Sequence, residues 1–203
     1  MTSMKQRLVK GIIVPLVTPL NDNRQLDIEC LYRLIDHVIE AGVNGIFILG
    51  TTGEACDLSV SIRHRLIQQT CEYVNRRILV QAGITHPELS QAVELARTAE
   101  DNGADAVVLH APFSPITQGE LLEYTNQVIR AVTLPLLLYN KPDSQDSRYE
   151  IDTLKKLIDT TPVAGLKDSS RDIEYFKKLV QLKSIKSGWA VLMGPEELLI
   201  EAM

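Results

Sequence analysis

Short, mostly apolar runs recur along this chain about every 30 residues, and this regularity restricts the possible fold more than any other feature. None of the runs alternates strictly between apolar and polar residues. A strand has such a sequence when both of its faces are buried, as in parallel strands covered by helices. The seven runs are GIIVPLV, GIFIL, ILVQAG, AVVLHA, PLLLY, VAGLK and WAVLM, from Gly11, Gly45, Ile78, Ala106, Pro135, Val163 and Trp189.

The segments between these runs have the period and the end signals of helices. The first opens on Asp27, a capping residue, and closes on Gly42. In a later segment, Thr117 and Glu120 have the spacing of a capping box. The sequence therefore predicts a strand followed by a helix six times over, then a seventh strand and the start of a helix. We expect one domain over residues 1–203.

Two α/β folds are built from such repeats, the closed (β/α)8 TIM barrel and the open doubly wound sheet. The open sheet usually carries a glycine-rich nucleotide loop after its first strand, and the stretch VTPLNDN contains none. Polar residues follow several different strands instead, which favours the barrel. Seven strands are visible, so the eighth strand and the C-terminal helices are expected to be missing. Either the chain is a fragment, or a partner or a rearrangement closes the sheet.

The composition of the chain limits the kinds of molecule that it is expected to bind. The net charge is −5 and no basic stripe stands out, so neither a nucleic acid nor a membrane is an expected partner. The three cysteines lack ligand spacing and fit free thiols in a cytoplasmic protein, with Cys30 and Cys71 expected in the core. No secretory signal is visible. The histidines outside strand ends show no metal-binding spacing, so we expect no metal.

A lysine ends the sixth apolar run, in the stretch PVAGLKDSS. Lys167 could be a solvated end residue, half of an ion pair with Asp168, or a desolvated nucleophile. For a lysine considered alone, the ion pair is the better interpretation. Burial among apolar groups at a barrel mouth would instead lower the pKa of the amine, because burial disfavours the ammonium form. A neutral amine can form a Schiff base with a ketone.

Residues after other strands favour the nucleophile. Tyr139 ends the preceding strand, so its hydroxyl could reach the same mouth and move protons, although a core tyrosine is an equally good interpretation. After the second strand, GTTGE supplies Thr51 and Thr52, whose hydroxyls and neighbouring amides suit a carboxylate. An isolated turn of this kind is more often only a turn, with Glu54 bracing it. His110 could line the mouth and tune the choice of acceptor.

Taken together, GTTGE, YN.P and GLKDSS, each after its own strand, resemble the dihydrodipicolinate synthase and N-acetylneuraminate lyase family. VPLVTPL resembles the first strand of that family, and the resemblance runs from Gly11 to the end of the chain. It implies a class I aldolase on a (β/α)8 barrel, usually a homotetramer, with no metal or organic cofactor. This chain apparently lacks the C-terminal part.

The resemblance also implies roles for individual residues. Lys167 matches the lysine that forms the Schiff base with pyruvate or another 2-oxo acid, and Tyr139 matches the general acid and base. Thr51 and Thr52 match the residues that hold the carboxylate, Thr51 also joining a hydroxyl proton relay. Gly194 matches a glycine near the bound substrate, after the seventh strand.

Two positions depart from the synthases of that family. Where these often have PYY after the fourth strand, this chain has APFSP, with Phe113 and Ser114, and a serine cannot complete the relay between subunits. Where they place an arginine after YN.P to bind the carboxylate of an amino aldehyde, this chain has Ser144, with Arg148 four residues further on. Both departures argue against a synthase of lysine biosynthesis, and the missing arginine favours a sugar-acid or hydroxy-oxo-acid aldolase.

The sequence thus predicts a lyase that joins or cleaves a 2-oxo acid and an aldehyde through a Schiff base. Dihydrodipicolinate synthase of lysine biosynthesis (4-hydroxy-tetrahydrodipicolinate synthase) is the nearest alternative. A second alternative belongs to a different function class: the chain is a truncated, non-catalytic remnant of such an enzyme. The expected absence of the eighth strand favours it.

Overall fold

The computed structural model describes residues 9–112, 114–141, 147–158, 163–186 and 188–202. Its strands are β1 Ile13–Pro15, β2 Gly45–Ile48, β3 Leu79–Gly83, β4 Ala106–Leu109, β5 Leu136–Asn140, β6 Val163–Asp168 and β7 Ala190–Met193. Its α-helices are α1 Ile28–Glu40, α2 Val60–Val74, α3 Leu89–Asp101, α4 Gln118–Ala131, α5 Ile151–Ile158, α6 Ile173–Gln181 and α7 Leu199–Ala202. Short 3₁₀ turns lie at η1 Ala55–Asp57, η3 Leu182–Ser184 and η4 Glu196–Leu198.

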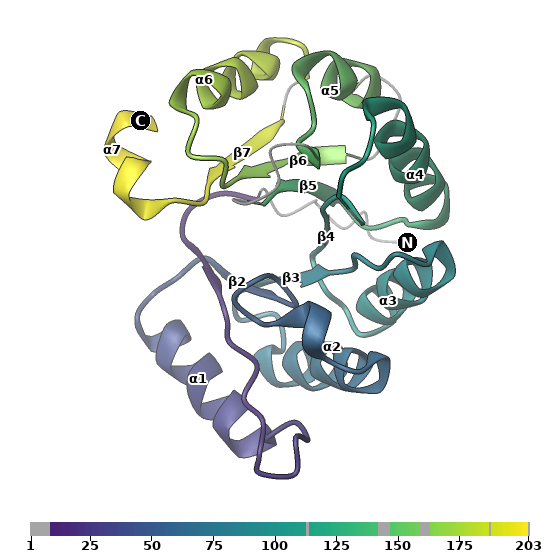
Figure 1. Cartoon of the computed structure of the whole chain (residues 1–203). Helices are drawn as coiled ribbons and strands as arrows, with labels where there is room; N and C mark the ends of the chain where they lie inside the picture. The colour runs from purple at the N-terminus through teal and green to yellow at the C-terminus, as the bar shows by residue number, and fades with distance from the viewer. Residues whose placement is uncertain (1–8, 113, 142–146, 159–162, 187, 203) are drawn as a thin grey trace, which may run out of the picture.

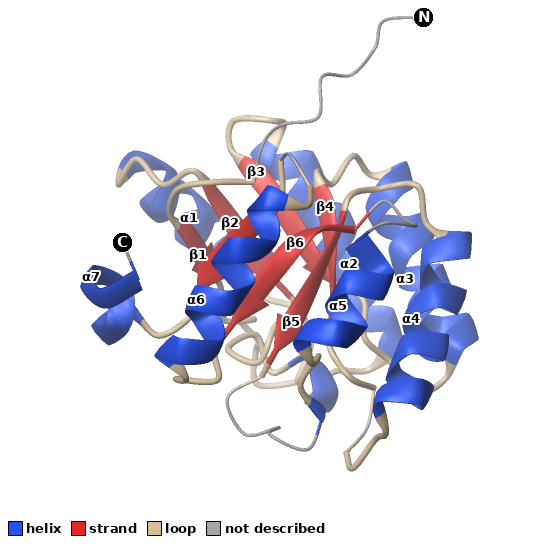
Figure 2. Cartoon of the chain, turned by 90° about the horizontal axis from the view of Figure 1, so that it is seen from above, coloured by secondary structure: helices blue, strands red, loops and turns tan. Residues whose placement is uncertain are grey.

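The seven strands form one parallel sheet in the order in which they occur along the chain, from β1 to β7. Figure 1 shows the sheet curled about its axis with the helices outside it, and Figure 2 shows the strands enclosed by helices from a second direction. The predicted barrel architecture with seven strands is confirmed. Within the described residues β1 and β7 are not paired with each other, so the wall stays open between them.

Successive side chains of each strand pack into different cores. Residues such as Ile46, Ile48 and Leu138 contribute to a large outer core between the sheet and the helices. A small inner core fills the barrel itself, and its buried members are Phe47, Ala106, Val108, Leu137 and Tyr139. Because strand side chains alternate in direction, burial on both faces explains why the runs in the sequence are continuously apolar.

The helix signals read from the sequence are largely those of the structure. Asp27 caps α1 by accepting a hydrogen bond from the amide of Cys30, and Thr117 and Glu120 form the capping box of α4. Gly42 follows α1 with a φ of 78°, a left-handed conformation that glycine adopts without a steric penalty. These local interactions set where each helix begins and ends.

The cysteines correct one prediction. Cys71 is buried, and burial raises the pKa of its thiol to about 12, but Cys30 is only half-buried and Cys56 is exposed. Cys30 lies on α1 outside the buried stripe formed by Leu31 and Ile35. Among the described residues no helix is long and apolar enough to cross a membrane, and no group of three or more His, Cys, Asp or Glu side chains could hold a metal ion.

Gly165→Ala is expected to destabilise the fold by about 1–3 kcal/mol, because overpacking displaces the neighbouring backbone. An added Cβ at Gly165 would lie 2.1 Å from the carbonyl oxygen of Ala190 on β7. The free energy of unfolding in urea measures the loss. Gly119→Ala is the control, because its Cβ would lie 4.0 Å from the nearest atom, Thr117 Oγ1. Equal stability of the two variants would contradict the tight β6–β7 packing.

Candidate active site

An irregularity in β6 determines which way Lys167 points. Leu136 pairs with Val163, whereas Leu137 pairs with Gly165, so β6 contains one more residue than β5 at this point. Strict alternation from Val163, an outer-core residue, would turn Lys167 outward. The extra residue reverses the alternation, and Lys167 becomes the cross-strand partner of Tyr139, whose ring belongs to the inner core.

The amine of Lys167 lies between two aromatic faces inside the barrel. Its Nζ atom is 4.6 Å from the centroid of the Tyr139 ring and 4.9 Å from that of Phe47. Burial lowers the pKa of Lys167 to about 8. Roughly a tenth of this amine is therefore neutral at pH 7, against about one part in three thousand for an ordinary lysine.

The alternative of an ion pair between Lys167 and Asp168 is wrong. Adjacent residues of a strand project to opposite faces, and the Asp168 carboxylate lies behind the barrel wall. There it accepts hydrogen bonds from the hydroxyl of Ser170 (2.9 Å) and the side-chain amide of Asn140 (3.3 Å). No salt bridge of Lys167 occurs among the described residues. The amine is thus desolvated without a compensating carboxylate, as a nucleophile requires.

Tyr139 and Thr51 come together although 88 positions separate them in the chain. The Tyr139 hydroxyl lies 3.5 Å from Thr51 Oγ1, which is long for a hydrogen bond between hydroxyl groups. Tyr139 is buried and Thr51 is exposed. The pair links the aromatic wall around Lys167 to the loop after β2, the first step that a hydroxyl relay would need.

The loop after β2 holds Thr51 and Thr52 at the surface beside the mouth. Both side chains are exposed, whereas Gly53 is buried and its carbonyl accepts a hydrogen bond of 2.8 Å from Thr18 Oγ1. The brace predicted from Glu54 thus comes from Thr18, which follows β1. Glu54 instead has a φ of 52°, so it contributes backbone geometry to the turn.

Gly194 follows β7 and lies against the end of β6. Its amide donates a hydrogen bond of 2.7 Å to the carbonyl of Asp168. An added Cβ at Gly194 would lie 2.0 Å from Ser169 Oγ, so no other residue fits without displacing that serine. Gly194 is therefore hydrogen-bonded to the residue that follows Lys167, and its amide is not free to bind a ligand.

His110 contacts Tyr139 edge-on, with ring centroids 6.2 Å apart and an interplanar angle of 81°. It lies just after β4, two residues beyond Val108, so its side chain points to the same inner face as that inner-core residue. Burial lowers the pKa of His110 to about 4, so the imidazole is neutral. Its Nδ1 carries the proton, since this atom lies 2.6 Å from the Ala111 carbonyl, which can only accept. The structure thus puts His110 at the mouth, where the sequence allowed it.

A cavity of about 440 Å³ opens beside Lys167 between the unpaired edges of β1 and β7. Its lining comes from the start of the described chain, the inner core and β7, and includes Ile13, Phe47, Gln81, Trp189 and Leu199. Tyr139, Thr51, Thr52 and Gly194 do not line it. The cavity therefore reaches the amine through the gap in the wall.

Sequence reasoning missed two groups in this site. Phe47 forms one aromatic face of the lysine environment, but its position within GIFIL resembles that of any core residue. Asn140, read only as part of YN.P, is fully buried and bonded to Asp168. Only the fact that each belongs to a motif-bearing strand could have drawn attention to them. The predictions for Phe113 and Ser144 concern residues outside the described ranges, and Ser114 is exposed.

The fold and the site together define the class of this protein: parallel barrels that hold a desolvated lysine beside a tyrosine at the mouth. Comparison with known proteins then identifies the family. A family model described as the dihydrodipicolinate synthetase family matches residues 8–203. The chain belongs to this family, as the resemblance of its motifs implied.

Curated relatives include enzymes with different names. The chain is 33% identical over 195 residues to the 4-hydroxy-tetrahydrodipicolinate synthase of Cellvibrio japonicus, a match that covers 96% of this chain and 67% of that protein. It is 30% identical over 196 residues to a probable 2-dehydro-3-deoxy-D-pentonate aldolase of Escherichia coli, covering 95% and 65%. The chain thus spans about two thirds of the length of these relatives.

Solved structures give the same fold. A prophage protein of the dihydrodipicolinic acid synthase family from Escherichia coli K12, in complex with pyruvate, superposes with a TM-score of 0.91 at 30% identity, covering 97% of this chain and 67% of that one. Dihydrodipicolinate synthase of Bacteroides thetaiotaomicron superposes with a TM-score of 0.89 at 39% identity, covering 95% and 65%. These matches confirm the TIM-barrel fold of the described strands and helices.

Lys167 is expected to react with an acylating reagent with a midpoint near pH 8, because burial keeps the amine neutral above that pH. Competitive acetylation at a series of pH values, followed by peptide mass analysis, measures the midpoint. Lys177 is the internal reference, since its hydrogen bond with Glu174 raises the pKa of its exposed amine. Coincident profiles for the two lysines would contradict the desolvation of Lys167.

Proposed function

We propose that this chain carries the catalytic site of a class I, Schiff-base-forming lyase that joins or cleaves a pyruvate-type 2-oxo acid and an aldehyde. The observation that carries the proposal is the Lys167 amine, buried between Tyr139 and Phe47 with a pKa lowered to about 8. Membership of the family supports it. The pyruvate bound to the prophage relative supports the class of oxo acid.

The steps follow from the chemistry of a neutral amine. Lys167 Nζ attacks the keto carbon of the oxo acid, and the carbinolamine loses water to give an imine. The protonated imine withdraws electrons, so C3 loses a proton and becomes an enamine, which attacks the aldehyde carbon. Water then hydrolyses the new imine, releasing the product and the free amine. Cleavage runs through the same steps in reverse, and neither direction requires a metal or an organic cofactor.

Tyr139 is the proposed proton carrier for these steps. Its ring packs against the amine, and its hydroxyl lies toward Thr51. A phenol in this position can give a proton to the departing hydroxyl of the carbinolamine and return one to the aldehyde oxygen. Thr51 would exchange that proton with the next group of a relay.

The loop after β2 is the proposed carboxylate site. Thr51 and Thr52 present hydroxyls at the mouth, and the bond between Thr18 and Gly53 fixes the turn that carries them. Gly194 is the proposed neighbour of the bound substrate, and it packs closely against Ser169, where an added Cβ would lie 2.0 Å from Oγ. The oxo acid would thus be held at its carboxylate end while its keto carbon faces Lys167.

The aldehyde partner is proposed to carry hydroxyl groups, as in sugar-acid or hydroxy-oxo-acid aldolases. Arg148 is not free to bind a carboxylate in the mouth: its Nη1 atom is 3.1 Å from Asp172 Oδ2, and its guanidinium lies over the ring of Tyr175. Dihydrodipicolinate synthase activity is the second candidate, favoured by the names of the Cellvibrio and Bacteroides relatives. Turnover of pyruvate with glyceraldehyde, compared with a carboxylate-bearing amino aldehyde, distinguishes them.

The assembly is proposed to be a homotetramer, as the family resemblance implies, and a cytoplasmic protein, as its free cysteines indicate. A non-catalytic protein is the remaining alternative, and the open wall between the described strands β1 and β7 favours it. Light scattering of the purified chain measures the assembly, and circular dichroism shows whether it folds. The trapping experiment that follows separates an active site from a remnant.

Borohydride reduction in the presence of pyruvate is expected to attach a reduced pyruvate group to Lys167 and inactivate the protein, because only this described amine is buried between aromatic faces. Peptide mass mapping locates the group. Lys167→Ala is expected to abolish labelling, and Lys177→Ala, which changes an exposed lysine, to leave it intact. Folded protein without a label on Lys167 would refute the proposal for this chain.

Tyr139→Phe is expected to slow trapping of pyruvate by roughly a hundredfold or more, since it removes the proton carrier and leaves the aromatic wall. Thr51→Val should slow it by about tenfold, because it removes only the neighbouring hydroxyl. Initial rates of label incorporation at fixed pyruvate concentration measure both effects. Unchanged rates in a folded Tyr139→Phe protein would remove this residue from the mechanism.

A further inference from the structure

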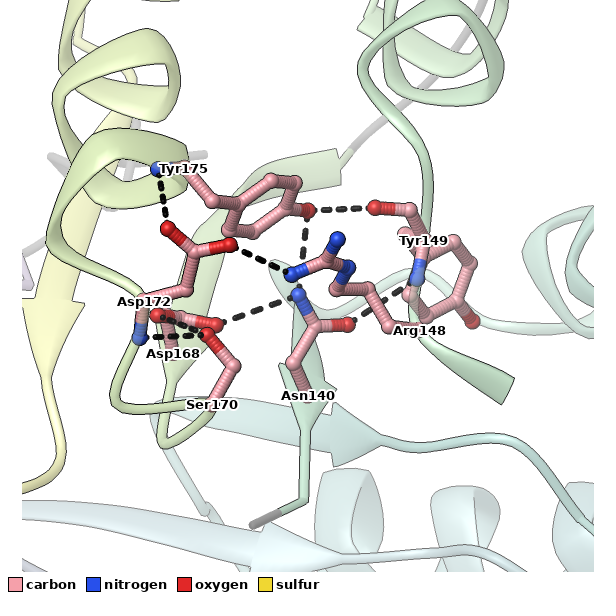
Figure 3. Close-up of polar contacts among 7 residues, drawn as sticks. All are labelled: Asn140, Arg148, Tyr149, Asp168, Ser170, Asp172 and Tyr175. Carbon is pink, nitrogen blue, oxygen red and sulfur yellow. Dashed lines mark hydrogen bonds and ion pairs between the residues drawn. The ribbon is translucent and has the colours of Figure 1, made fainter. Parts of the chain in front are cut away.

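Asn140 and Asp168 occupy equivalent places behind the two reacting side chains. Asn140 follows Tyr139 at the end of β5, Asp168 follows Lys167 at the end of β6, and the two are paired in register. Both are 1% exposed. Because adjacent residues of a strand face opposite ways, their side chains meet behind the barrel wall while Tyr139 and Lys167 meet in front of it. Figure 3 shows this rear cluster.

The side chain of Asn140 uses every hydrogen-bonding group it has except one lone pair. Its amide nitrogen donates to Asp168 Oδ1 (3.3 Å) and to the hydroxyl of Tyr175 (3.0 Å). Its amide oxygen accepts from the backbone N–H of Tyr149 (3.1 Å). Two donors and one acceptor on a short planar group are what an asparagine supplies and an aspartate does not. The position therefore selects an amide.

Asp168 completes the link between the strands. One carboxylate oxygen accepts from Asn140 and the other from the hydroxyl of Ser170. Its backbone carbonyl accepts from the amide of Gly194, and the amide of Ser169 donates to the carbonyl of Asn140. The ends of β5, β6 and β7 are thereby tied together at the level of the lysine.

Helix α6 holds this cluster in place from outside. The Tyr175 hydroxyl donates to the carbonyl of Tyr149, and the Arg148 guanidinium lies 4.4 Å from the centroid of the Tyr175 ring. Arg148 also pairs with Asp172, which caps α6 through the amide of Tyr175. Figure 3 shows Arg148 and Asp172 flanking the Tyr175 ring. The buried bonds of Asn140 are thus backed by a helix and by the segment before α5.

This arrangement matters because the register of β6 is not fixed by its alternation alone. The extra residue between Val163 and Gly165 sets Lys167 opposite Tyr139, and a slip by one residue would turn Lys167 away from the barrel. A bond between the residues that directly follow Tyr139 and Lys167 resists that slip where it would have the greatest effect on the site.

We propose that Asn140 and Asp168 are positioning residues for the Schiff-base reaction: their buried hydrogen bond holds β5 and β6 in the register that keeps the Lys167 amine against Tyr139. The proposal rests on the proposed function for its catalytic consequence. Its structural consequence, the environment of the Lys167 amine, does not require that any substrate bind.

The test begins with Asn140→Asp in the full chain. The variant keeps the acceptor for the Tyr149 amide, removes both donors and sets two carboxyl groups against each other. The initial rate of pyruvate trapping is expected to fall between about tenfold and a hundredfold, because the amine is displaced from its attacking position. The pyruvate concentration for half-maximal trapping should change less than about threefold, because the carboxylate loop on β2 is untouched.

The second readout is the acetylation midpoint of Lys167, measured without substrate. In Asn140→Asp it is expected to move up from about 8 toward the value of an ordinary lysine, because an amine that leaves the aromatic wall regains water. If the parent protein traps no pyruvate, the proposed function fails and this midpoint alone decides the positioning role. The two failures are therefore distinguishable.

Thr125→Val is the matched control. It removes two buried hydrogen bonds of Thr125 Oγ1, one to the carbonyl of Leu121 (2.7 Å) and one with the hydroxyl of Tyr149 (2.9 Å), without touching Asn140 or Asp168. It should lower the melting temperature while leaving the trapping rate and the Lys167 midpoint unchanged. Equal changes in both variants would overturn the proposal, since general loss of stability would then explain them.

A second pair of variants covers the case in which Asn140→Asp does not fold. Asp168→Asn alone removes the charge but keeps an acceptor for Asn140, and should slow trapping less. The double variant Asn140→Asp, Asp168→Asn exchanges donor and acceptor between the strands and is expected to recover most of the rate and the midpoint. A folded single variant with the rate and midpoint of the parent, or a double variant no better than the single, would overturn the proposal.

Discussion

One extra residue in β6 governs the direction of every later side chain in that strand. Val163 faces the helices, and without the irregularity Leu166 would face the barrel and Lys167 the helices. With it, Leu166 joins the outer core and the lysine enters the inner one, against Tyr139 and Phe47. The lowered pKa of the amine and the lack of a Lys167 salt bridge among the described residues both follow from this reversal, because the same step sends Asp168 to the other face.

The site is built in two layers that share strands. In front of the wall, Lys167 and Tyr139 have aromatic and hydroxyl neighbours; behind it, Asn140 and Asp168 have hydrogen bonds to α6 and to the segment before α5. The site is least enclosed at the gap between β1 and β7. Its cavity reaches Lys167, and apolar side chains such as Ile12 and Leu199 are exposed on either side of it. The extent to which water is excluded from the Lys167 amine therefore depends on what lies against that gap.

Much of the architecture could be predicted because it depends on local signals. Continuous apolar runs required strands buried on both faces, and Asp27, Thr117 and Gly42 act at the helix ends through their own side chain or backbone. The clustering of Lys167 with Tyr139 could be predicted because strand ends of a barrel converge. Phe47 and the contacts of Asn140 could not be, since nothing in their local sequence distinguishes them from ordinary core and strand-end residues.

The sequence by itself determined the repeat, the curled sheet and the set of strand ends from which a site could be built, because burial on two faces and helix capping are properties of short segments. Only the tertiary structure decided that Lys167 faces Tyr139 and not Asp168, that Thr18 braces the loop of Thr51, and that the imidazole of His110 is neutral. These outcomes depend on the register between strands and on desolvation by residues distant in sequence, which no local pattern records.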